Sequence, residues 1–547
     1  MKERKHPKAL PYLFLSEMWE RFGYYLMIGI FTLYLKDKEK GFGLSEAEAS
    51  DLYGTFIALV FLTPFIGGLL ADRILGYRKA IIFGGLLMGV GYSLMGIHSL
   101  PMLYTAMTLI IIGNGFFKPN ISTLLGNVYN EERYIAKKDE GYNIFYMGIN
   151  IGAFICNFFG AFMYNILGWE AAFLTAGIGM FIGVIIFWLG TNHFKHADVI
   201  KPTQAEDMSL SKISGYILLP AALFGVIGYF LNGVTDKALN PDGNYLGSDT
   251  TDAFILACIP VVIFYARIWF KATSEEKKPI GAMLTIFAVV IAFWAVFKQN
   301  GSTLNTWADR YTDREVPTAI APAFQQLKLV QEIPYIKDTV DVLDNQFRET
   351  GEKAIDYPSY YSNMEKDKLP KSGETVYAFN TNLFQSVNPF WVIILTPLVV
   401  AFFTFLRYRQ KEPSTPTKIF FGLFITALSC LVMVAAVYES GNGAVKASPW
   451  WFIASYGVLT IGELCLSPMG LSLVSKLSPP RLTALMMGGW FLATSIGNKL
   501  SGVMSSMWDK YDEKANFFWV NFVLLLIASA LMLFVLKRLN RIFKEHI

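Results

Sequence analysis

Residues 12–35, YLFLSEMWERFGYYLMIGIFTLYL, form a stretch long and apolar enough to cross a bilayer, yet it carries three charges. A helix needs about 20 apolar residues to span roughly 30 Å of hydrocarbon. Glu17, Glu20 and Arg21 are spaced at i, i+3 and i+4, so they share a helical face on which opposite charges can pair. Charges inside a span are costly and usually face a protein interior or a water-filled cavity. The stretch therefore predicts a membrane helix that holds a buried functional cluster; a purely structural ion pair that holds a bundle together is the alternative.

The composition of the whole chain is that of a membrane protein. Of 547 residues, 53% are hydrophobic, 15% are aromatic and only 16% are charged. The net charge of +4 is spread along the chain without a basic patch, which argues against a nucleic-acid partner. The cysteines lie inside apolar runs without paired spacing or neighbouring histidines; they are Cys156, Cys258, Cys430 and Cys465. We therefore expect no disulfide framework, metal site or cofactor.

Apolar runs near span length recur along the chain, and we expect fourteen membrane helices. They lie near residues 12–35, 51–72, 79–98, 102–124, 142–167, 171–191, 213–233, 251–271, 280–307, 386–407, 417–438, 449–471, 482–507 and 515–537. Short loops rich in Lys and Arg stay on the cytoplasmic side of a membrane. The loops after the second, fourth and sixth spans are rich in these residues, which predicts that both termini are cytoplasmic. The expected location is the cell (inner) membrane, as a multi-pass protein.

One long segment does not have a lipid-like composition. Residues 309–385 are polar, mixed in charge and dotted with prolines, and the span order places them on the outer side. We expect an extracytoplasmic insertion that forms a partly ordered surface loop, as long loops often do. A role in binding an extracytoplasmic partner is the alternative.

Further polar residues fall within the expected spans. Lys118, Lys298 and Glu463 are deep, and each is a candidate functional residue because a charge in lipid is costly. Lys499 either faces the interior or extends its amine to the membrane surface. Asn150 lies among small residues that let helices approach closely, so its amide serves either packing or binding. Carboxylates and cations spread over several spans suit a cavity for a ligand that bears both charges.

The sequence resembles the proton-coupled oligopeptide transporters, a branch of the major facilitator superfamily. The resemblance rests on EMWERFGYY at 17–25, GGLLADRILGYRK at 67–79 and YNIFYMGINIGAF at 142–154. Shorter matches are FKPN at 117–120, FWA at 293–295, QNGS at 299–302, FQSVNP at 384–389 and GELCLSP at 462–468. The matches cover nearly the whole chain outside the insertion.

This resemblance implies an all-α membrane protein with the major facilitator fold. Residues 1–192 would form the N-terminal six-helix bundle and residues 280–547 the C-terminal one, with the insertion inside the latter. Residues 193–279 would be a linker that carries two additional transmembrane helices. In such a fold, alternating access proceeds by rocking one bundle against the other around a central site.

The resemblance also implies roles for individual residues. Arg21, Lys118 and Tyr25 would hold the carboxylate of a di- or tripeptide, since cations suit carboxylate recognition. A second group, comprising Asn150, Asn388 and Glu463, would hold its amino group. The remaining residues expected to contact substrate are Tyr24, Trp294, Lys298 and Trp490, with the two tryptophans lining side-chain pockets.

Proton coupling needs a carboxylate whose proton occupancy changes between the two states of the transporter. Glu20, next to Arg21, is the first candidate and Glu17 the second. Protonation of the acid would free Arg21 to bind the substrate carboxylate.

The sequence departs from the family pattern at several positions. Lys298 stands where members usually carry an acid, and Ile28 stands where they usually carry arginine. In the family, the acid and the arginine at these two positions can form a salt bridge between the bundles that closes the outer side. Phe61 replaces a common pocket tyrosine, and Gly54 replaces a histidine of animal members. An unpaired Lys298 would be costly, so we expect it either to pair with Glu20 or Glu463 or to be neutral.

The leading hypothesis is a proton-coupled symporter that imports di- and tripeptides. A second hypothesis is a carrier of another small zwitterion or anion, with proton coupling altered by Lys298 and Ile28. The third is a membrane enzyme or a receptor that transports nothing. None of the five histidines lies in the middle of a span, and no nucleophile with a base is evident, so we do not expect an enzyme.

Overall fold

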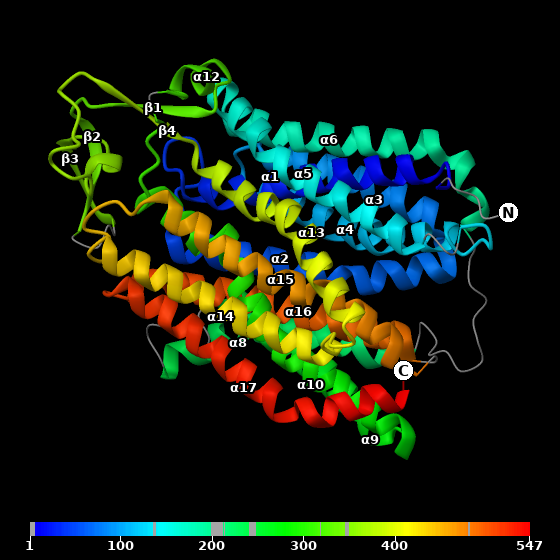
Figure 1. Cartoon of the computed structure of the whole chain (residues 1–547). Coiled ribbons are helices and arrows are strands. Elements are labelled where there is room, and N and C mark those ends of the chain that lie inside the picture. The colour runs from blue at the N-terminus through cyan, green and yellow to red at the C-terminus, as the bar shows by residue number, and fades with distance from the viewer. Residues whose placement is uncertain are drawn as a thin grey trace.

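The structure is a computed structural model that describes residues 6–134, 138–198, 212, 214–239, 248–317, 319–344, 349–479 and 482–546. Long helices run side by side through most of it, and a small β-containing module lies at one end (Figure 1). Both chain termini lie at the opposite end. We call these two ends the insertion end and the termini end.

The first bundle contains six long helices. They are α1 (Leu10–Lys36), α2 (Glu46–Leu70), α3 (Tyr77–Met95), α4 (Leu100–Val128), α5 (Lys138–Leu167) and α6 (Trp169–Gly190). The first of them has Pro11 in its first turn, where the missing backbone N–H costs no helical hydrogen bond. The second begins with a reciprocal capping box between Ser45 and Glu48. Glycine allows close packing between them: a Cβ at Gly152 would lie 2.3 Å from the carbonyl oxygen of Met18.

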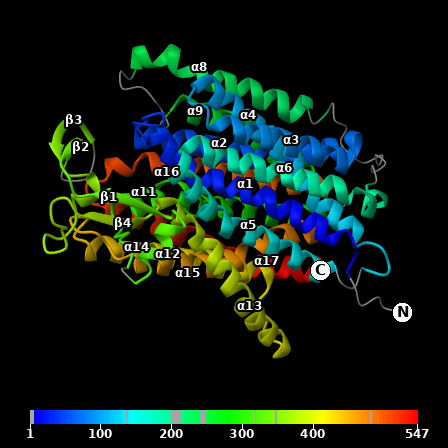
Figure 2. The same cartoon turned by 90° about the horizontal axis from the view of Figure 1, so that it is seen from above.

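A two-helix hairpin follows the first bundle and consists of α8 (Leu219–Leu239) and α9 (Asp249–Lys271). The hairpin packs against the rest of the protein through α9, which contacts α2, α10 and α16. Figure 2 shows α8 at one edge of the molecule, with α13 at the opposite edge. The hydroxyl of Ser248 caps the start of α9 by accepting a hydrogen bond from the backbone N–H of Thr251.

The second bundle contains α10 (Ser274–Phe297), α11 (Thr303–Arg310), α13 (Val387–Tyr408), α14 (Thr415–Glu439), α15 (Pro449–Leu477), α16 (Thr483–Ser506) and α17 (Lys514–His546). The expected span over residues 280–307 lies within Ser274–Arg310, one segment long and apolar enough to cross a membrane. A 3₁₀ turn at Lys298–Gly301 interrupts this segment and separates α10 from α11. Gly301 explains the break, because a Cβ there would lie 2.0 Å from the hydroxyl of Tyr53. Lys298 is therefore placed at a helix interruption.

Long helices lie over all fourteen expected spans in the described chain. Nine segments of the described residues are long and apolar enough to cross a membrane, judged by length and composition. The charged helix α1 is not one of these nine. Burial is densest within the two bundles, each of which has its own apolar core.

The insertion folds into more than a surface loop, contrary to our expectation. It contains α12 (Ala321–Gln326) and four strands in two antiparallel pairs. In the first pair, β1 (Val330–Pro334) lies against β4 (Thr375–Phe379); in the second, β2 (Asp338–Leu343) lies against β3 (Glu349–Asp356). Its small apolar core consists of Ile333, Tyr360, Tyr361, Val376 and Ala378. The strands are only five to eight residues long, so each has few alternating apolar and polar positions. In a segment of mainly polar composition, this short alternation gives no clear strand signal.

Candidate functional site

The two bundles meet at the insertion end. Hydrogen bonds between described residues of the two bundles lie in the half of the molecule nearer the insertion: Thr32 Oγ1 donates to Gly301 O at 2.8 Å, and Asn157 Nδ2 donates to Ser386 Oγ at 3.0 Å. Backbones also touch there, because a Cβ at Gly54 would come within 2.6 Å of the Cα of Gly502. The site between the bundles is therefore closed at the insertion end.

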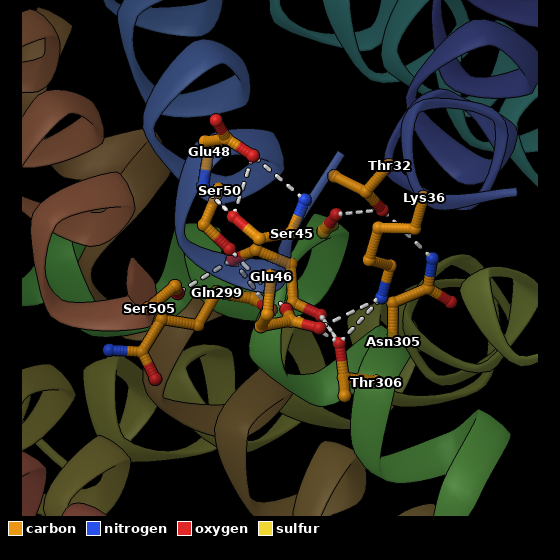
Figure 3. A network of polar contacts seen from close by, with 12 residues as sticks. Thr32, Lys36, Ser45, Glu46, Glu48, Ser50, Gln299, Asn305, Thr306 and Ser505 are labelled. Carbon is orange, nitrogen blue, oxygen red and sulfur yellow. Dashed lines mark hydrogen bonds and ion pairs between the residues drawn. The ribbon is translucent and has the colours of Figure 1, made fainter. Parts of the chain in front are cut away.

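A buried polar cluster forms part of this closure (Figure 3). Lys36 Nζ, at the end of α1, lies 3.1 Å from Glu46 Oε2 at the start of α2. Thr306 of α11 in the second bundle donates a hydrogen bond to Glu46 Oε1 at 2.9 Å and accepts one from Lys36 at 2.9 Å. Sequence reasoning missed these residues, because polar side chains at span ends are common and carry no signal of their own.

A second cluster joins both bundles and the hairpin. Lys499 Nζ of α16 lies 2.6 Å from Asp51 Oδ1 of α2 and donates to Thr55 Oγ1 at 2.7 Å. The hydroxyls of Thr250 and Thr251, on α9, donate to the same carboxylate at 2.6 and 3.0 Å. The Lys499 side chain is only 2% exposed, so it does not extend to the membrane surface. We call the pair of clusters the polar closure.

The charged residues of α1 form the expected ion cluster. Arg21 donates two hydrogen bonds to Glu20, one of them from a terminal nitrogen at 2.6 Å. Arg21 Nε also lies 3.4 Å from Glu17 Oε1, while Glu17 Oε2 has no hydrogen-bond partner among the described residues. The guanidinium stacks 4.8 Å from the ring centroid of Tyr24. All three charged side chains are buried, so Arg21 is occupied by acids in this state.

Two lysines from different helices face one aromatic ring. The amine of Lys118, on α4, lies 3.9 Å from the ring centroid of Phe61, and that of Lys298 lies 4.9 Å from it. Neither amine is within 4.0 Å of a carboxylate among the described residues. The predicted pairing of Lys298 with Glu20 or Glu463 is therefore not formed in this structure. The π-face of Phe61 partly compensates both cations.

Glu463 lies among amides on the side of the second bundle. Asn388 Nδ2 of α13 donates to Glu463 Oε2 at 3.0 Å and to Thr460 Oγ1 at 3.0 Å. Asn150 instead donates to its own helix, at Tyr146 O, 2.9 Å away. Asn388 and Glu463 are thus brought together, whereas the Asn150 amide is bonded elsewhere.

Tyrosines connect the two charged regions. Tyr25 lies in the electrostatic field of both Arg21 and Glu463, and Tyr146 lies in the field of Glu463 and Tyr25. Sequence reasoning did not assign Tyr146, although it belongs to the 142–154 motif. Both tyrosines therefore lie within electrostatic range of Glu463, and Tyr25 also lies within range of Arg21.

The aromatic residues occupy different surroundings. Trp294 lies with its ring centroid 5.7 Å from the Lys298 amine, and its indole N–H has no hydrogen-bond partner among the described residues. Trp490 packs edge-to-face on Phe287 at a centroid distance of 6.1 Å. Trp294 therefore borders the lysine pair, whereas Trp490 lies in the apolar packing of the second bundle.

The charged groups of the site suit the binding of a ligand with two charges. In the part of the chain that the structure describes, no three side chains of His, Cys, Asp or Glu converge as metal ligands would. A cationic region and a carboxylate with an amide instead offer complementary partners to a zwitterion.

Two helical bundles closed against each other at one end, with buried charges between them, define a membrane transporter of the major facilitator type. The chain belongs to the POT family, whose sequence pattern matches residues 78–341 and 371–520. The match covers α3 to α6 of the first bundle, the hairpin, the second bundle up to the start of α17 and most of the insertion.

Known proteins of this family are similar over almost their full length. The di-/tripeptide transporter of Lactococcus lactis subsp. lactis (strain IL1403) is 28% identical over 539 residues, covering 97% of this chain and 95% of that protein. Dipeptide and tripeptide permease A of Escherichia coli (strain K12) is 28% identical over 508 residues, covering 92% and 85%. The crystal structure of peptide transporter POT in complex with sulfate superposes with a TM-score of 0.74 at 26% identity, covering 98% of this chain and 96% of that chain.

Proposed function

We propose that the protein is a proton-coupled symporter that imports di- and tripeptides by alternating access. The carrying observation is a pair of interior regions of opposite charge, in which Arg21 is buried and the other members are half-buried. One holds Arg21, Lys118 and Tyr25, and the other holds Glu463 with Asn388. A short peptide bears a carboxylate and an ammonium at its ends, so it matches both regions at once. The relatives that carry peptides support this assignment.

The proposed substrate contacts follow from this arrangement. The carboxylate binds Arg21 and Lys118, and the hydroxyl of Tyr25 contributes a hydrogen bond. The ammonium binds Glu463 and Asn388, and Asn150 joins them if its amide leaves Tyr146 O. The side chains of the peptide face Trp294, Tyr24 and Trp490, and Lys298 borders the same space.

Proton coupling is proposed to act through Arg21. In this structure both Glu20 and Glu17 hold the guanidinium. A proton that binds Glu20 removes its negative charge, so Arg21 loses its strongest partner and becomes available to the peptide carboxylate. Proton binding and peptide binding then favour each other, which is the linkage that a symporter requires.

The sidedness and the domain organisation are part of the proposal. The insertion end faces outward, both termini face the cytoplasm, and the membrane is the cell (inner) membrane, as the basic loops indicate. The structure then represents a state closed to the outside. Residues 1–192 and 280–547 act as the two moving bundles, and residues 193–279 link them.

Uptake into proteoliposomes tests the proposal. A labelled dipeptide should accumulate when an inward proton gradient is imposed and should only equilibrate without one. Unlabelled dipeptides and tripeptides should compete, whereas free amino acids should not. Absence of both uptake and competition by every peptide tried would contradict the peptide assignment.

One observation favours a second candidate function, the transport of another small zwitterion or anion. The amines of Lys118 and Lys298 both face Phe61 and lack an acidic partner within 4.0 Å among the described residues. A site with two unpaired lysines suits a ligand with more negative charge than a neutral peptide. Competition of dipeptide uptake by aspartyl peptides and by dicarboxylates distinguishes the two candidates.

A further inference from the structure

A cavity of about 540 Å³ lies outside the central site, between the first bundle and the insertion. Lys36 to Glu39, at the end of α1, and Tyr164 and Trp169, at the ends of α5 and α6, form one wall. Arg310 at the end of α11 and residues of β1, β2 and β3 form the other. The cavity is within the range of roughly 300–1,000 Å³ that small-molecule sites occupy. The first bundle thus supplies one wall, and the second bundle with its insertion supplies the other.

Buried polar groups without partners line this cavity. Arg314, Asn380 and Asn382 all line it and are 4%, 5% and 4% exposed. Arg314 Nε, Asn380 Nδ2 and Asn382 Oδ1 have no hydrogen-bond partner among the described residues. A buried polar atom left unpaired costs about 1–3 kcal/mol. Three such atoms at one cavity indicate a place for a polar ligand.

The charges of the lining favour an anion. Its buried and half-buried acids are already engaged: Asp309 is bound by Arg314 at 3.2 Å, Asp37 accepts from Trp169 at 2.7 Å, and Asp341 pairs with Lys38 at 3.2 Å. The remaining acid, Glu39, is exposed.

Two cations at the same cavity form no close ion pair. Arg310 and Lys353 line the cavity and lie more than 4.0 Å from every carboxylate of the described residues, although Glu46, Asp309 and Asp509 belong to the electrostatic surroundings of Arg310. An arginine with free donors and an unpaired amide N–H are the groups that recognise a carboxylate.

We propose that this cavity binds a small carboxylate from the outer medium and thereby holds the transporter closed to the outside. Arg310 and Asn380 bind the carboxylate, and Asn382 accepts a hydrogen bond from the rest of the ligand. The two walls belong to bundles that separate when the outer side opens, so the ligand binds the closed state and shifts the population toward it. The sidedness and the separation of the walls rest on the proposed function. The carboxylate comes either from a peptide terminus or from a free carboxylic acid.

Binding to the full-length protein in lipid nanodiscs tests the site. The background variant Arg21→Met removes the central carboxylate site, so remaining binding reports the cavity. Isothermal titration with N-acetyl-dialanine should show one site, and dialanine amide, which lacks the carboxylate, should show none. Succinate serves as the free-acid probe. Binding of N-acetyl-dialanine identifies a peptide terminus as a source of the carboxylate, and binding of succinate alone identifies a free acid. Either outcome supports the site.

Cavity variants in the same background decide whether the binding is at this place. Asn380→Leu and Arg310→Met should each weaken the probe that binds by at least tenfold, and Arg310→Lys should weaken it less. The controls Gln326→Leu and Lys337→Met change an exposed amide and an exposed lysine of the insertion outside the cavity, so binding should be unchanged. The proposal is overturned if neither carboxylate probe binds, or if binding survives both Asn380→Leu and Arg310→Met.

A transport measurement tests whether the bound carboxylate holds the transporter closed to the outside. The probe that binds, added outside proteoliposomes of the otherwise unaltered protein, should slow dipeptide counterflow, and Asn380→Leu should relieve this inhibition without changing the rate in its absence. Inhibition that persists in Asn380→Leu would contradict the link to closure. If neither protein shows counterflow, the peptide function fails, while the nanodisc titration still reports on the cavity.

Discussion

At the scale of single residues, the proposed function assigns substrate and proton chemistry to Arg21 and its two acids, which lie within two helical turns. Glu20 accepts hydrogen bonds from Nε and a terminal nitrogen of the guanidinium, and Glu17 lies 3.4 Å from Nε. Two carboxylates thus already neutralise this cation, and in the proposed mechanism protonation of one acid lowers the negative charge that a ligand carboxylate meets there.

Replacing Glu20 by Gln should separate coupling from binding. Glu20→Gln mimics the protonated acid, so Arg21 is permanently released. We expect gradient-driven accumulation of dipeptide to fall to the level of equilibration, while counterflow exchange stays within about threefold of wild type. The matched control is Glu170→Gln, an exposed acid at the start of α6. Equal loss of accumulation and counterflow in Glu20→Gln would show that Glu20 has a structural role instead.

The lysine pair at Phe61 offers a second test at this scale. Removal of one charge by Lys298→Met should lower the affinity for the carboxylate end of the substrate by about tenfold, since hydrogen bonds to charged groups contribute about 1.5–3 kcal/mol. The pH profile of uptake should also change, because the neighbouring acid Glu463 loses a cation from its surroundings. Lys278→Met changes an exposed lysine in the first turns of α10, the helix that precedes Lys298, and is the control. An unchanged affinity and pH profile would remove Lys298 from the site.

Lys446, in the loop between α14 and α15, makes a pH-dependent contribution to the insertion end. Its amine lies 4.1 Å from the ring centroid of Tyr360, and burial lowers its pKa from the ordinary 10.5 to about 7. Arg314 lowers this pKa further, while Asp309 and Asp313 raise it. Because the folded state holds the proton less tightly, stability rises with pH between 7 and 10.5, and the full penalty of the charged amine is present below pH 7.

Lys446→Met should therefore stabilise the insertion at pH 6 by on the order of 1–3 kcal/mol, reduced by the loss of the contact with Tyr360. The gain should shrink as the pH rises from 7 toward 10.5. Thermal unfolding of the variant, compared with wild type at pH 6 and pH 9.5, measures the effect, and the exposed Lys371→Met is the control. A gain that is independent of pH would show that the amine is not responsible.

At the scale of helices, Ile28 has no charge and cannot form a salt bridge with Lys298. The polar closure instead links the two bundles at the insertion end. Asp51 of α2 is the common acceptor for Lys499 of α16 and for the hydroxyls of α9. The closure therefore involves the linker hairpin as well as the two bundles. Breaking a buried ion pair by removing one partner costs about 3–5 kcal/mol in the state where the pair exists.

Lys499→Met should loosen the outer contact between α2 and α16. Ser505→Cys, at a buried position on α16, reports this opening through reaction with a maleimide that does not cross membranes. We expect labelling to be at least tenfold faster in the Lys499→Met background than with wild-type Lys499. Lys510→Met, an exposed lysine just beyond the same helix, should leave the labelling rate unchanged. Equal rates in all backgrounds would show that the ion pair does not hold the closure.

At the scale of the whole molecule, the sequence predicted what depends on local pattern. Runs of about 20 apolar residues gave the helices, and charges such as Arg21 and Glu463 in the middle of such runs marked the interior. It could not predict the break at Lys298–Gly301, where Tyr53 from another helix crowds the backbone. Nor could it pair Lys499 with Asp51, because the partners are distant in sequence and each is ordinary in its local context. The roles of the substrate and proton residues remain predictions until they are measured.

The polar closure also affects which state the transporter occupies in the absence of substrate. If these contacts are lost when the insertion end opens, the closed state is the resting one under the proposed sidedness, and an external peptide then meets a binding-competent protein only during rare openings. Its apparent dissociation constant is then the intrinsic one divided by the open fraction. If one molecule in about a hundred is open, affinity from outside is about a hundredfold weaker than affinity from inside. Lys499 would thus set the peptide concentration at which uptake half-saturates, although no contact with the peptide is assigned to it.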